Sequence, residues 1–347
     1  AEFVRRGHEV HLVVSRIGRH FPLPSEVRVH HLRTWSWNKK KQRIRFSQQV
    51  QHLLRRTHFD LSFSLGRTAG QDVVLAPANH LGFKRAEGQV PNQWRDQVQI
   101  QLDRDSFTSS RLVLAASHMM KEELIELYGI SSEKIEVLYP PIDIKKFTRL
   151  PPARRQDLRN QWGLSAEKRY FLFVSTSHKR KGLPLLLDVF SRLTDLPYEL
   201  LICGKPLVQT DLPNVRYLGH HSQVEELYNC CDYTIHPAQY EPFGQIVVES
   251  LQCGCPVLVS ERVGAKEILN ESLGRVVPGF EAQTWALCIR SLVDTRFAVP
   301  VDFALIEKLD TQSHVTKLLA LLAQHGIIEG RRNSNHLGET PRPNQAH

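Results

Sequence analysis

The chain has 347 residues, of which 41% are hydrophobic and 23% charged, and its formal net charge is +9. These proportions are typical of a soluble globular protein, and the length is enough for two domains with sizeable cores. No apolar run approaches the roughly 18 to 20 residues that a membrane-spanning helix needs, and the opening stretch AEFVRRGHEV lacks the apolar segment of a secretory signal. The sequence therefore predicts neither an integral membrane protein nor an exported one.

Cysteine usage indicates the cellular compartment. None of the six cysteines belongs to a Cys-x-x-Cys pair or to a group spaced with histidines as metal ligands are. We expect reduced, mostly buried thiols and a cytoplasmic protein. The cysteines are Cys203, Cys230, Cys231, Cys253, Cys255 and Cys288.

The positive charge is concentrated in the first half of the chain. Residues 1–138 hold 21 Lys and Arg against 14 Asp and Glu. The stretch TWSWNKKKQRIRF places Trp35 and Trp37 beside the cations of residues 39–45, which suits an anionic membrane interface on the inner face of the cytoplasmic membrane. The alternative for Trp35 to Arg45 is a solvated helix start with two packed indoles. No nucleic-acid-binding motif accompanies the charge, so no nucleic-acid partner is expected.

Short β-branched segments alternate with amphipathic segments along most of the chain. This alternation is typical of parallel sheets whose strands are joined by crossover helices, so the predicted fold class is α/β. Strands are expected in the first half at residues 8–15, 27–32, 60–66, 72–77 and 111–117. They are expected in the second half at residues 168–175, 198–204, 214–219, 232–237 and 255–260. Helices are expected at 117–129, with Ser117 as the N-cap, and at 222–232.

A proline-rich segment divides the chain. Residues 138–155 read LYPPIDIKKFTRLPPARR, and the two Pro-Pro pairs prevent a helix or strand from continuing through them. The sequence predicts two Rossmann-like domains that face each other across a cleft. Their expected bounds are residues 1–138 and 156–330, with a linker at 139–155 between them. A polar tail at 331–347 is expected to be disordered.

The first domain is expected to lack a strand. A doubly wound domain normally opens with its central strand and a tight loop. Residues 1–14 read instead as the end of a helix, a C-cap at Gly7 and a strand. We expect the natural gene to encode about 15 to 35 further residues, roughly one strand, a loop and half a helix.

Residues 241–250, EPFGQIVVES, combine a glycine turn with two carboxylates. Gly244 allows the backbone to turn into a helix whose first N–H groups lack partners, which is a favourable place for phosphate. Glu249 lies about one turn into that helix and could accept hydrogen bonds from a ribose diol. Glu241 precedes the turn and would face hydroxyl groups of whatever the phosphate carries.

A second candidate site is the stretch VSTSHKRKGLPLLLDVF at residues 174–190. An expected strand ends there in a polar loop that contains Arg180 and Lys181, and Gly182 then opens a helix. Cations beside a helix N-terminus would neutralise a diphosphate. A solvated basic loop is the alternative interpretation.

Several motifs occur in the order and at the separations that are typical of one family. Together they resemble the retaining glycosyltransferases of family 4, which have the GT-B fold of two Rossmann-like domains facing across a cleft. The resemblance extends over nearly the whole chain. The motifs are the Glu241/Glu249 pair, the turn at residues 180–182, residues 116–147 and the stretch GCPVLVSERVGAKEIL at residues 254–269.

The resemblance implies roles for individual residues. Glu249, the second acid, would hold the ribose of a nucleotide-sugar, and Glu241, the first, would contact the donor sugar. Arg180 and Lys181 would hold the diphosphate. The other donor-binding residues that it implies are Phe243, Gly244, Gln245 and Ile246 at the turn, and Tyr217 and Leu218 beside the base.

Within the family, residues 60–83 are similar to the acceptor side of bacterial lipopolysaccharide-core glucosyltransferases. This similarity places His80 at the edge of the cleft near the sugar, as a candidate catalytic residue. A lone histidine at a strand end is more often structural, which is the alternative. Arg67 and Thr68 would line the acceptor side.

The stretch LDRDS has the same spacing of acids as the metal-binding Asp-x-Asp motif of a different glycosyltransferase fold. Its acids, Asp103 and Asp105, fall in a helical-looking segment at residues 94–107 and are expected on a solvated face. Neither a metal nor another cofactor is expected, because the nucleotide-sugar is a co-substrate. Transfer with retention of the anomeric configuration would depend on Arg180, Lys181 and the helix N-terminus, which would stabilise the departing diphosphate.

The predicted function is therefore that of a retaining hexosyltransferase. It would move a hexose from a nucleotide-sugar, expected to be a UDP-sugar, to a glycolipid, a lipopolysaccharide or another saccharide acceptor. Two alternatives stay open at this point. One is a sugar-nucleotide epimerase of the same fold, and the other is an inactive nucleotide-sugar-binding protein.

Overall fold

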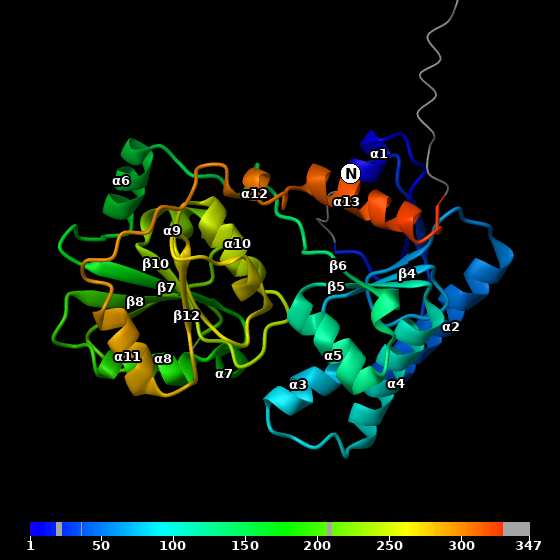
Figure 1. Ribbon diagram of the computed structural model, residues 1–347, viewed down its shortest axis with the longest axis horizontal. Helices are drawn as coiled ribbons and strands as arrows, with labels where there is room; N and C mark the ends of the chain where they lie inside the picture. Colours follow the sequence, from blue (N-terminus) through cyan, green and yellow to red (C-terminus); the bar gives the residue numbers. More distant parts are fainter. Residues whose placement is uncertain (19–22, 36, 207–209, 329–347) are drawn as a thin grey trace, which may run out of the picture.

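The computed structural model describes residues 1–18, 23–35, 37–206 and 210–328. The chain forms two units that lie side by side, each built on parallel strands (Figure 1). The predicted α/β class is confirmed. The tail at 331–347, which is predicted to be disordered, lies outside the described residues.

The second unit is built on a six-stranded parallel sheet in the order β12-β11-β10-β7-β8-β9. In its strand β7, Phe171 and Phe173 pack into one cluster of buried side chains, and Tyr170 and Leu172 pack into another. Neighbouring residues of a strand point to opposite faces, so both faces of this sheet are covered. The strands are β7 (Arg169–Ser175), β8 (Tyr198–Gly204), β9 (Val215–Gly219), β10 (Tyr233–His236), β11 (Val257–Ser260) and β12 (Gly274–Val277).

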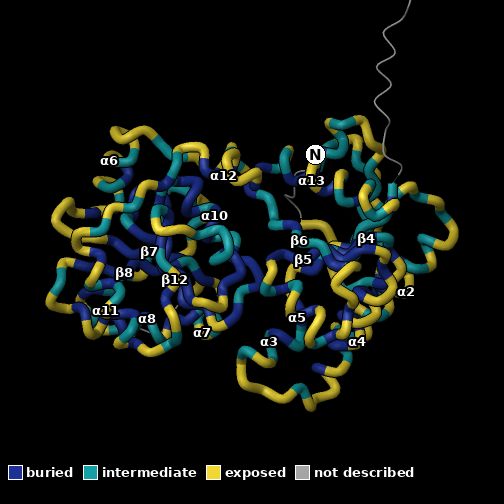
Figure 2. Tube along the Cα trace, in the orientation of Figure 1, coloured by how far each residue is buried: buried dark blue, intermediate teal, exposed yellow. Residues whose placement is uncertain are grey.

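Helices cover the two faces of that sheet. α8 and α11 pack together on one face, where Leu186 and Trp285 are buried, and α9 and α10 cover the other with Leu227 and Leu251. Figure 2 shows β7 and β8, in the middle of the sheet, largely in the dark blue of buried residues, inside a more exposed outer layer. The helices are α6 (Pro152–Gln161), α7 (His178–Lys181), α8 (Leu183–Ser191), α9 (Val224–Cys230), α10 (Gln245–Gln252) and α11 (Ala282–Arg290).

The first unit contains a four-stranded parallel sheet, in the order β3-β4-β5-β6, and a separate parallel pair of β1 and β2. Among the described residues, no hydrogen-bonded ladder joins the pair to the larger sheet. The expectation of further residues ahead of Ala1 stays a prediction. The strands are β1 (His11–Val14), β2 (Arg28–His31), β3 (Phe63–Ser64), β4 (Val73–Ala76), β5 (Leu112–Ala115) and β6 (Ile135–Val137).

Two helices cover one face of the four-stranded sheet, where Phe107 of α4 and Leu124 of α5 are buried with Val113. α5 begins at the predicted N-cap, since Ser117 Oγ accepts a hydrogen bond from Met120 N at 3.0 Å. The helices of this unit are α1 (Glu2–Arg5), α2 (Lys39–Arg56), α3 (His80–Ala86), α4 (Trp94–Ser109) and α5 (His118–Tyr128).

Each strand that the sequence predicts overlaps a strand of the structure. Two further strands, β6 and β12, were not predicted. The basic stretch after β7, which was expected to be a loop, is the single-turn helix α7.

The end of the described chain returns to the first unit. It contains α12 (Phe303–Ile306) and α13 (Thr311–Gln324), and α13 lies beside α1 (Figure 1). Leu318 and Leu322 of α13 are buried with Val73 and Leu114 of the four-stranded sheet. The structure therefore differs from the expected division, in which residues 156–330 form one domain. The physical reason is that the apolar side of α13 covers the sheet face opposite α4 and α5.

Replacing Leu322 by Ala should loosen the first unit, because a cavity at a buried leucine costs about 2 to 5 kcal/mol. Amide hydrogen exchange should become faster in β4 and β5 and stay unchanged in β7 and β8. Leu305→Ala, at an exposed side chain of α12, is the control and should change neither sheet. Faster exchange in β7 and β8, with β4 and β5 unaffected, would contradict the placement of α13.

Candidate active site

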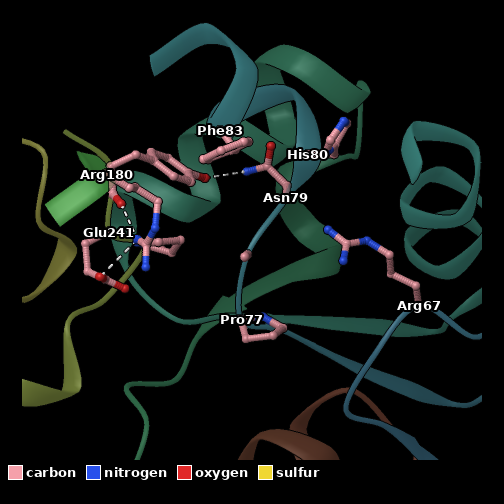
Figure 3. A pocket seen from close by; sticks show the side chains of 10 residues that line it. Arg67, Pro77, Asn79, His80, Phe83, Arg180 and Glu241 are labelled. Atoms are coloured by element: carbon pink, nitrogen blue, oxygen red, sulfur yellow. Dashed lines mark hydrogen bonds and ion pairs between the residues drawn. The ribbon is translucent and has the colours of Figure 1, made fainter. Parts of the chain in front are cut away.

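A cavity of about 280 Å³ lies between the two units, beside the carboxyl ends of their strands. Ligands of open α/β sheets bind at such strand ends. The side chains that surround the cavity come from both units (Figure 3). They are Arg67, Pro77, Ala78, Asn79, His80 and Phe83 from the first unit, and Arg180, Tyr240, Glu241 and Pro242 from the second.

The structure brings four of the predicted site residues together here, namely Glu241, Arg180, His80 and Arg67. In Figure 3, Arg180 lies against Glu241 on one side of the cavity, and Arg67 extends from the other side. Thr68 is instead engaged within its own loop, where its hydroxyl contacts the side chains of two neighbouring residues.

The loop that carries Glu241 is fixed by its backbone. Glu241 N donates to Arg262 O at 3.0 Å, and Gly264 N donates to Glu241 O at 2.9 Å. Gly244 then precedes α10 with a φ of +102°, a conformation that favours glycine. A Cβ at this position would lie 2.9 Å from Val263 Cγ1. The predicted glycine turn into a helix is confirmed.

Three side chains approach one oxygen of the Glu241 carboxylate. Its Oε2 lies 3.2 Å from Arg180 Nη1, 4.0 Å from Lys181 Nζ and 3.6 Å from His236 Nε2. Burial raises the pKa of Glu241, but the close approach of His236 and the charges of Lys181 and Arg180 outweigh that effect and hold the pKa below its ordinary value. Burial lowers the pKa of His236, so its ring is neutral at pH 7 and the two cations carry the positive charge. Glu241 is therefore ionised at neutral pH.

Lys181 interacts with both acids of the predicted pair. Burial lowers the pKa of Lys181, whereas the charges of Glu241 and Glu249 raise it. Glu249 accepts a hydrogen bond from the Tyr228 hydroxyl at 3.2 Å. Burial raises the pKa of Glu249, because a charged carboxylate is poorly solvated there.

Gly182 allows α7 to approach the end of β10. Its φ is +87°, and a Cβ would collide with the Pro237 carbonyl oxygen. This close approach brings Arg180 to the loop after β10, where Arg180 Nη1 donates to Tyr240 O at 2.8 Å. The interpretation of this segment as a solvated basic loop is therefore wrong for Arg180 and Lys181.

Three other residues of the predicted donor site surround the start of α10. Phe243 stacks on Tyr139 with ring centroids 5.5 Å apart. Gln245 Nε2 donates to Pro141 O at 2.7 Å. Ile246 is half-buried in the first turn of α10. The glycine turn is thereby attached to the segment that links the two units.

Tyr217 and Leu218, predicted to lie beside the base, belong to the edge strand β9. The Tyr217 hydroxyl donates to Gly204 O at 2.9 Å, and the Leu218 carbonyl oxygen lies 2.7 Å from His221 Nε2. A base could therefore bond to this carbonyl only through its second lone pair.

On the acceptor side, His80 begins α3. Its Nε2 lies 2.8 Å from Asp96 Oδ1, and Lys84 Nζ lies 3.5 Å from the same oxygen. The hydrogen bond to His80 lowers the pKa of Asp96. Asp96 thus orients the ring, a role that the sequence did not reveal because a single acid in a helix carries no spacing signal.

Asp103 was expected on a solvated face, and this expectation is wrong. Its carboxylate is buried and forms an ion pair with Arg67. It also accepts hydrogen bonds from His80 N at 2.8 Å and from the Tyr128 hydroxyl at 3.0 Å. Asp103 therefore fixes both Arg67 and the start of α3. Asp105, two residues further along, is exposed as expected.

Direct hydrogen bonds join the two units on either side of Glu241. The Tyr240 hydroxyl donates to Glu123 Oε2 at 2.6 Å, and Ser117 Oγ donates to Pro242 O at 2.6 Å. Burial raises the pKa of Glu123. The partners are 117 and 125 residues apart in the sequence, so no local pattern could have indicated them.

Comparisons with known proteins decide the family. A family model described as Glycosyltransferase Family 4 matches residues 1–146, and one described as Glycosyl transferases group 1 matches residues 154–303. A probable transglycosylase of Burkholderia thailandensis is 35% identical over 302 residues, which make up 83% of this chain and 80% of the relative. The chain belongs to glycosyltransferase family 4. It is accordingly an enzyme, and its reaction is glycosyl transfer.

Solved structures have the same fold as this glycosyltransferase. WaaG, a glycosyltransferase involved in lipopolysaccharide biosynthesis, matches with a TM-score of 0.74 and 20% identity over 94% of this chain and 93% of its own. Anabaena HepE in complex with UDP-glucose matches with a TM-score of 0.62 and 18% identity over 86% of each chain. At these identities the likeness concerns the fold alone, and it confirms the predicted GT-B architecture.

Replacing Asp103 of this glycosyltransferase by Ala should lower the free energy of unfolding by about 1 to 3 kcal/mol, because the His80 N–H and the Tyr128 hydroxyl lose their buried acceptor and the half-buried Arg67 loses its ion pair. Chemical denaturation measures the effect. Asp105→Ala in the same helix is the matched control and should leave the midpoint unchanged. A D103A protein as stable as the wild type would show that the buried ion pair is unimportant.

Proposed function

We propose that this glycosyltransferase moves a hexose from a UDP-sugar to a glycolipid or another saccharide acceptor, with retention of the anomeric configuration. The observation that carries the proposal is the ionised Glu241 beside Arg180 and Lys181 in a cavity that both units line. Such a carboxylate accepts hydrogen bonds from sugar hydroxyls, and the neighbouring cations suit a diphosphate.

The donor would lie across the start of α10. Its diphosphate would bind the first N–H groups of that helix together with Arg180 and Lys181. The ribose diol would donate to Glu249, which currently accepts from Tyr228. The hexose would then reach Glu241, on the side of the cavity that faces the first unit.

Catalysis would come from stabilising the leaving group. As the bond between the anomeric carbon and the diphosphate oxygen breaks, negative charge grows on that oxygen, and Arg180 and Lys181 bind it more strongly in the transition state. The acceptor hydroxyl would attack from the same face and give its proton to the departing phosphate. This scheme requires neither a side-chain nucleophile nor a metal ion.

The acceptor would enter from the first unit. His80 and Arg67 line the cavity there, and the carboxylates of Asp96 and Asp103 hold them in place. We assign to His80 a contact with the reacting sugar or the acceptor, and to Arg67 a contact with the acceptor.

Two proteins of the same fold support the choice of donor and acceptor. HepE is described in complex with UDP-glucose, and WaaG is described as involved in lipopolysaccharide biosynthesis. An epimerase of the same fold and an inactive nucleotide-sugar-binding protein are not favoured, because the matching family models describe transferases.

We further propose that the basic segment docks on an anionic membrane surface, where a glycolipid acceptor would be found. The basic segment consists of Trp35, Trp37, Lys39, Lys41, Arg43 and Arg45, which surround the start of α2. The two indoles are 73% and 91% exposed, so they are not packed into the core. The first turn of α2 holds no acidic residue. In the described part of the chain, no helix is both long enough and apolar enough to span a bilayer.

Glu249→Ala should weaken UDP binding by about 1 to 3 kcal/mol, the scale of a lost charge-assisted hydrogen bond. Glu241→Ala should weaken UDP-glucose binding more than UDP binding, because Glu241 is assigned to the sugar. Calorimetry with both ligands measures these effects, and Glu261→Ala, at an exposed acid nearby, is the control. Equal losses for the two ligands in E241A would refute the assignment of Glu241 to the sugar.

Neutralising Lys39 and Lys41 with Gln should reduce sedimentation with anionic vesicles at low salt, because surface attraction to anionic lipid falls with each lost cation. Added salt should weaken the wild-type interaction in the same way. The double variant R55Q and R56Q removes the same charge from exposed residues at the other end of α2 and should sediment like the wild type. If all three proteins sediment alike, the basic segment does not bind membranes.

A further inference from the structure

His236 occupies the last position of β10, directly behind the cavity. Its side chain is 1% exposed, and within the described residues neither ring nitrogen has a hydrogen-bond partner. A buried imidazole without partners is destabilising, because its nitrogen atoms have lost their hydrogen bonds to water and have formed none with the protein. Such a group requires an explanation, and a contact that forms only when the donor binds would supply one.

The nearest acceptor for that ring is the acid assigned to the donor sugar. His236 Nε2 lies 3.6 Å from Glu241 Oε2, slightly beyond hydrogen-bonding distance. In this state the same oxygen is engaged by Arg180 at 3.2 Å, with Lys181 at 4.0 Å. The cations therefore hold the carboxylate just out of reach of the imidazole.

The position of the ring is fixed by the backbone around it. Pro237, the next residue, is packed closely against Gly182, and Ser260 Oγ donates to Ala238 O at 2.6 Å. The carboxylate of Glu241 is on a loop residue and has three side-chain torsions. A closer contact between the two groups would therefore arise from movement of Glu241 toward His236.

Donor binding would change the balance of charges at this point. A diphosphate carries more negative charge than one carboxylate, so Arg180 and Lys181 would turn toward it and leave Glu241. A carboxylate in this buried place then needs another hydrogen-bond donor to remain ionised and oriented.

We propose that His236 is a positioning residue for the donor sugar, which donates from Nε2 to Glu241 once the diphosphate has drawn Arg180 and Lys181 away. This inference rests on the proposed function, because it takes the contact of Glu241 with the sugar as given. The charged groups that act on His236 are Glu241, Lys181 and Arg180, and burial lowers the pKa of His236. The neutral ring with its proton on Nε2 is the form that acts.

Two variants of similar volume test the role. His236→Met removes the donor, and His236→Gln keeps an N–H group near the place of Nε2. By calorimetry, H236M should bind UDP-glucose about tenfold more weakly than the wild type, the effect of one hydrogen bond to a charged group. Its UDP affinity should stay within about twofold, which also shows that the second unit is folded. H236Q should recover part of the loss for UDP-glucose.

A double-mutant cycle separates this proposal from the one on which it rests. In a protein that already carries Glu241→Ala, the further change H236M should cost no additional UDP-glucose affinity, because His236 acts through Glu241. Two results would overturn the role of His236 but leave the role of Glu241 intact. One is that the losses of UDP-glucose affinity in H236M and E241A add fully in the double variant. The other is that H236M loses equal affinity for UDP and UDP-glucose. If E241A binds UDP-glucose like the wild type, the assignment of Glu241 fails, and the role of His236 fails with it.

The pH dependence gives an independent readout. Removing the imidazole donor should raise the pKa of Glu241 in the UDP-glucose complex, since the ionised form loses a hydrogen bond. The loss of UDP-glucose affinity on acidification should therefore begin at a higher pH in H236M than in the wild type. Coincident pH profiles would contradict the proposal.

Discussion

The site depends on keeping one carboxylate ionised where water is scarce. Glu241 lies in a cavity between two units, and its charge is stable there because Arg180, Lys181 and His236 approach the same oxygen. The backbone features around it serve this arrangement: Gly182 brings the cations against the end of β10, and Gly244 turns the chain into α10. A side chain at either glycine would separate the acid from its partners or from the helix N-terminus.

The second constraint is that both units must fix the position of the loop that carries Glu241. Tyr240 and Pro242, on either side of the acid, bond to Glu123 and Ser117 of the first unit. The donor acid is therefore oriented partly by the unit that would bind the acceptor. α13 adds a further link, because it follows the second unit in sequence and packs on the sheet of the first. A substitution in the first unit can therefore alter the orientation of Glu241 through these contacts, even where the substituted residue does not contact the donor.

The features that the sequence predicted are local ones. The strands, the Ser117 cap and the Gly244 turn are each determined by residues that are neighbours in the sequence. The spacing of Glu241 and Glu249 likewise follows from one turn and the helix after it. Asp103, Glu123, His236 and α13 were misplaced or missed, because their roles are set by partners far away in sequence. Asp103 lies in the same helix as the exposed Asp105, and the buried partner Arg67 is what distinguishes it. The four-stranded sheet that α13 covers could not be inferred from the helix itself.

The proposed mechanism depends on the exchange of partners around Glu241 when a donor binds. The most direct measurement is a crystal structure of the protein with UDP-glucose. We expect the diphosphate against Arg180, Lys181 and the first turn of α10, the ribose on Glu249, and the glucose hydroxyls on a Glu241 that has left Arg180. A complex in which Arg180 still pairs with Glu241, with the diphosphate bound elsewhere, would contradict it.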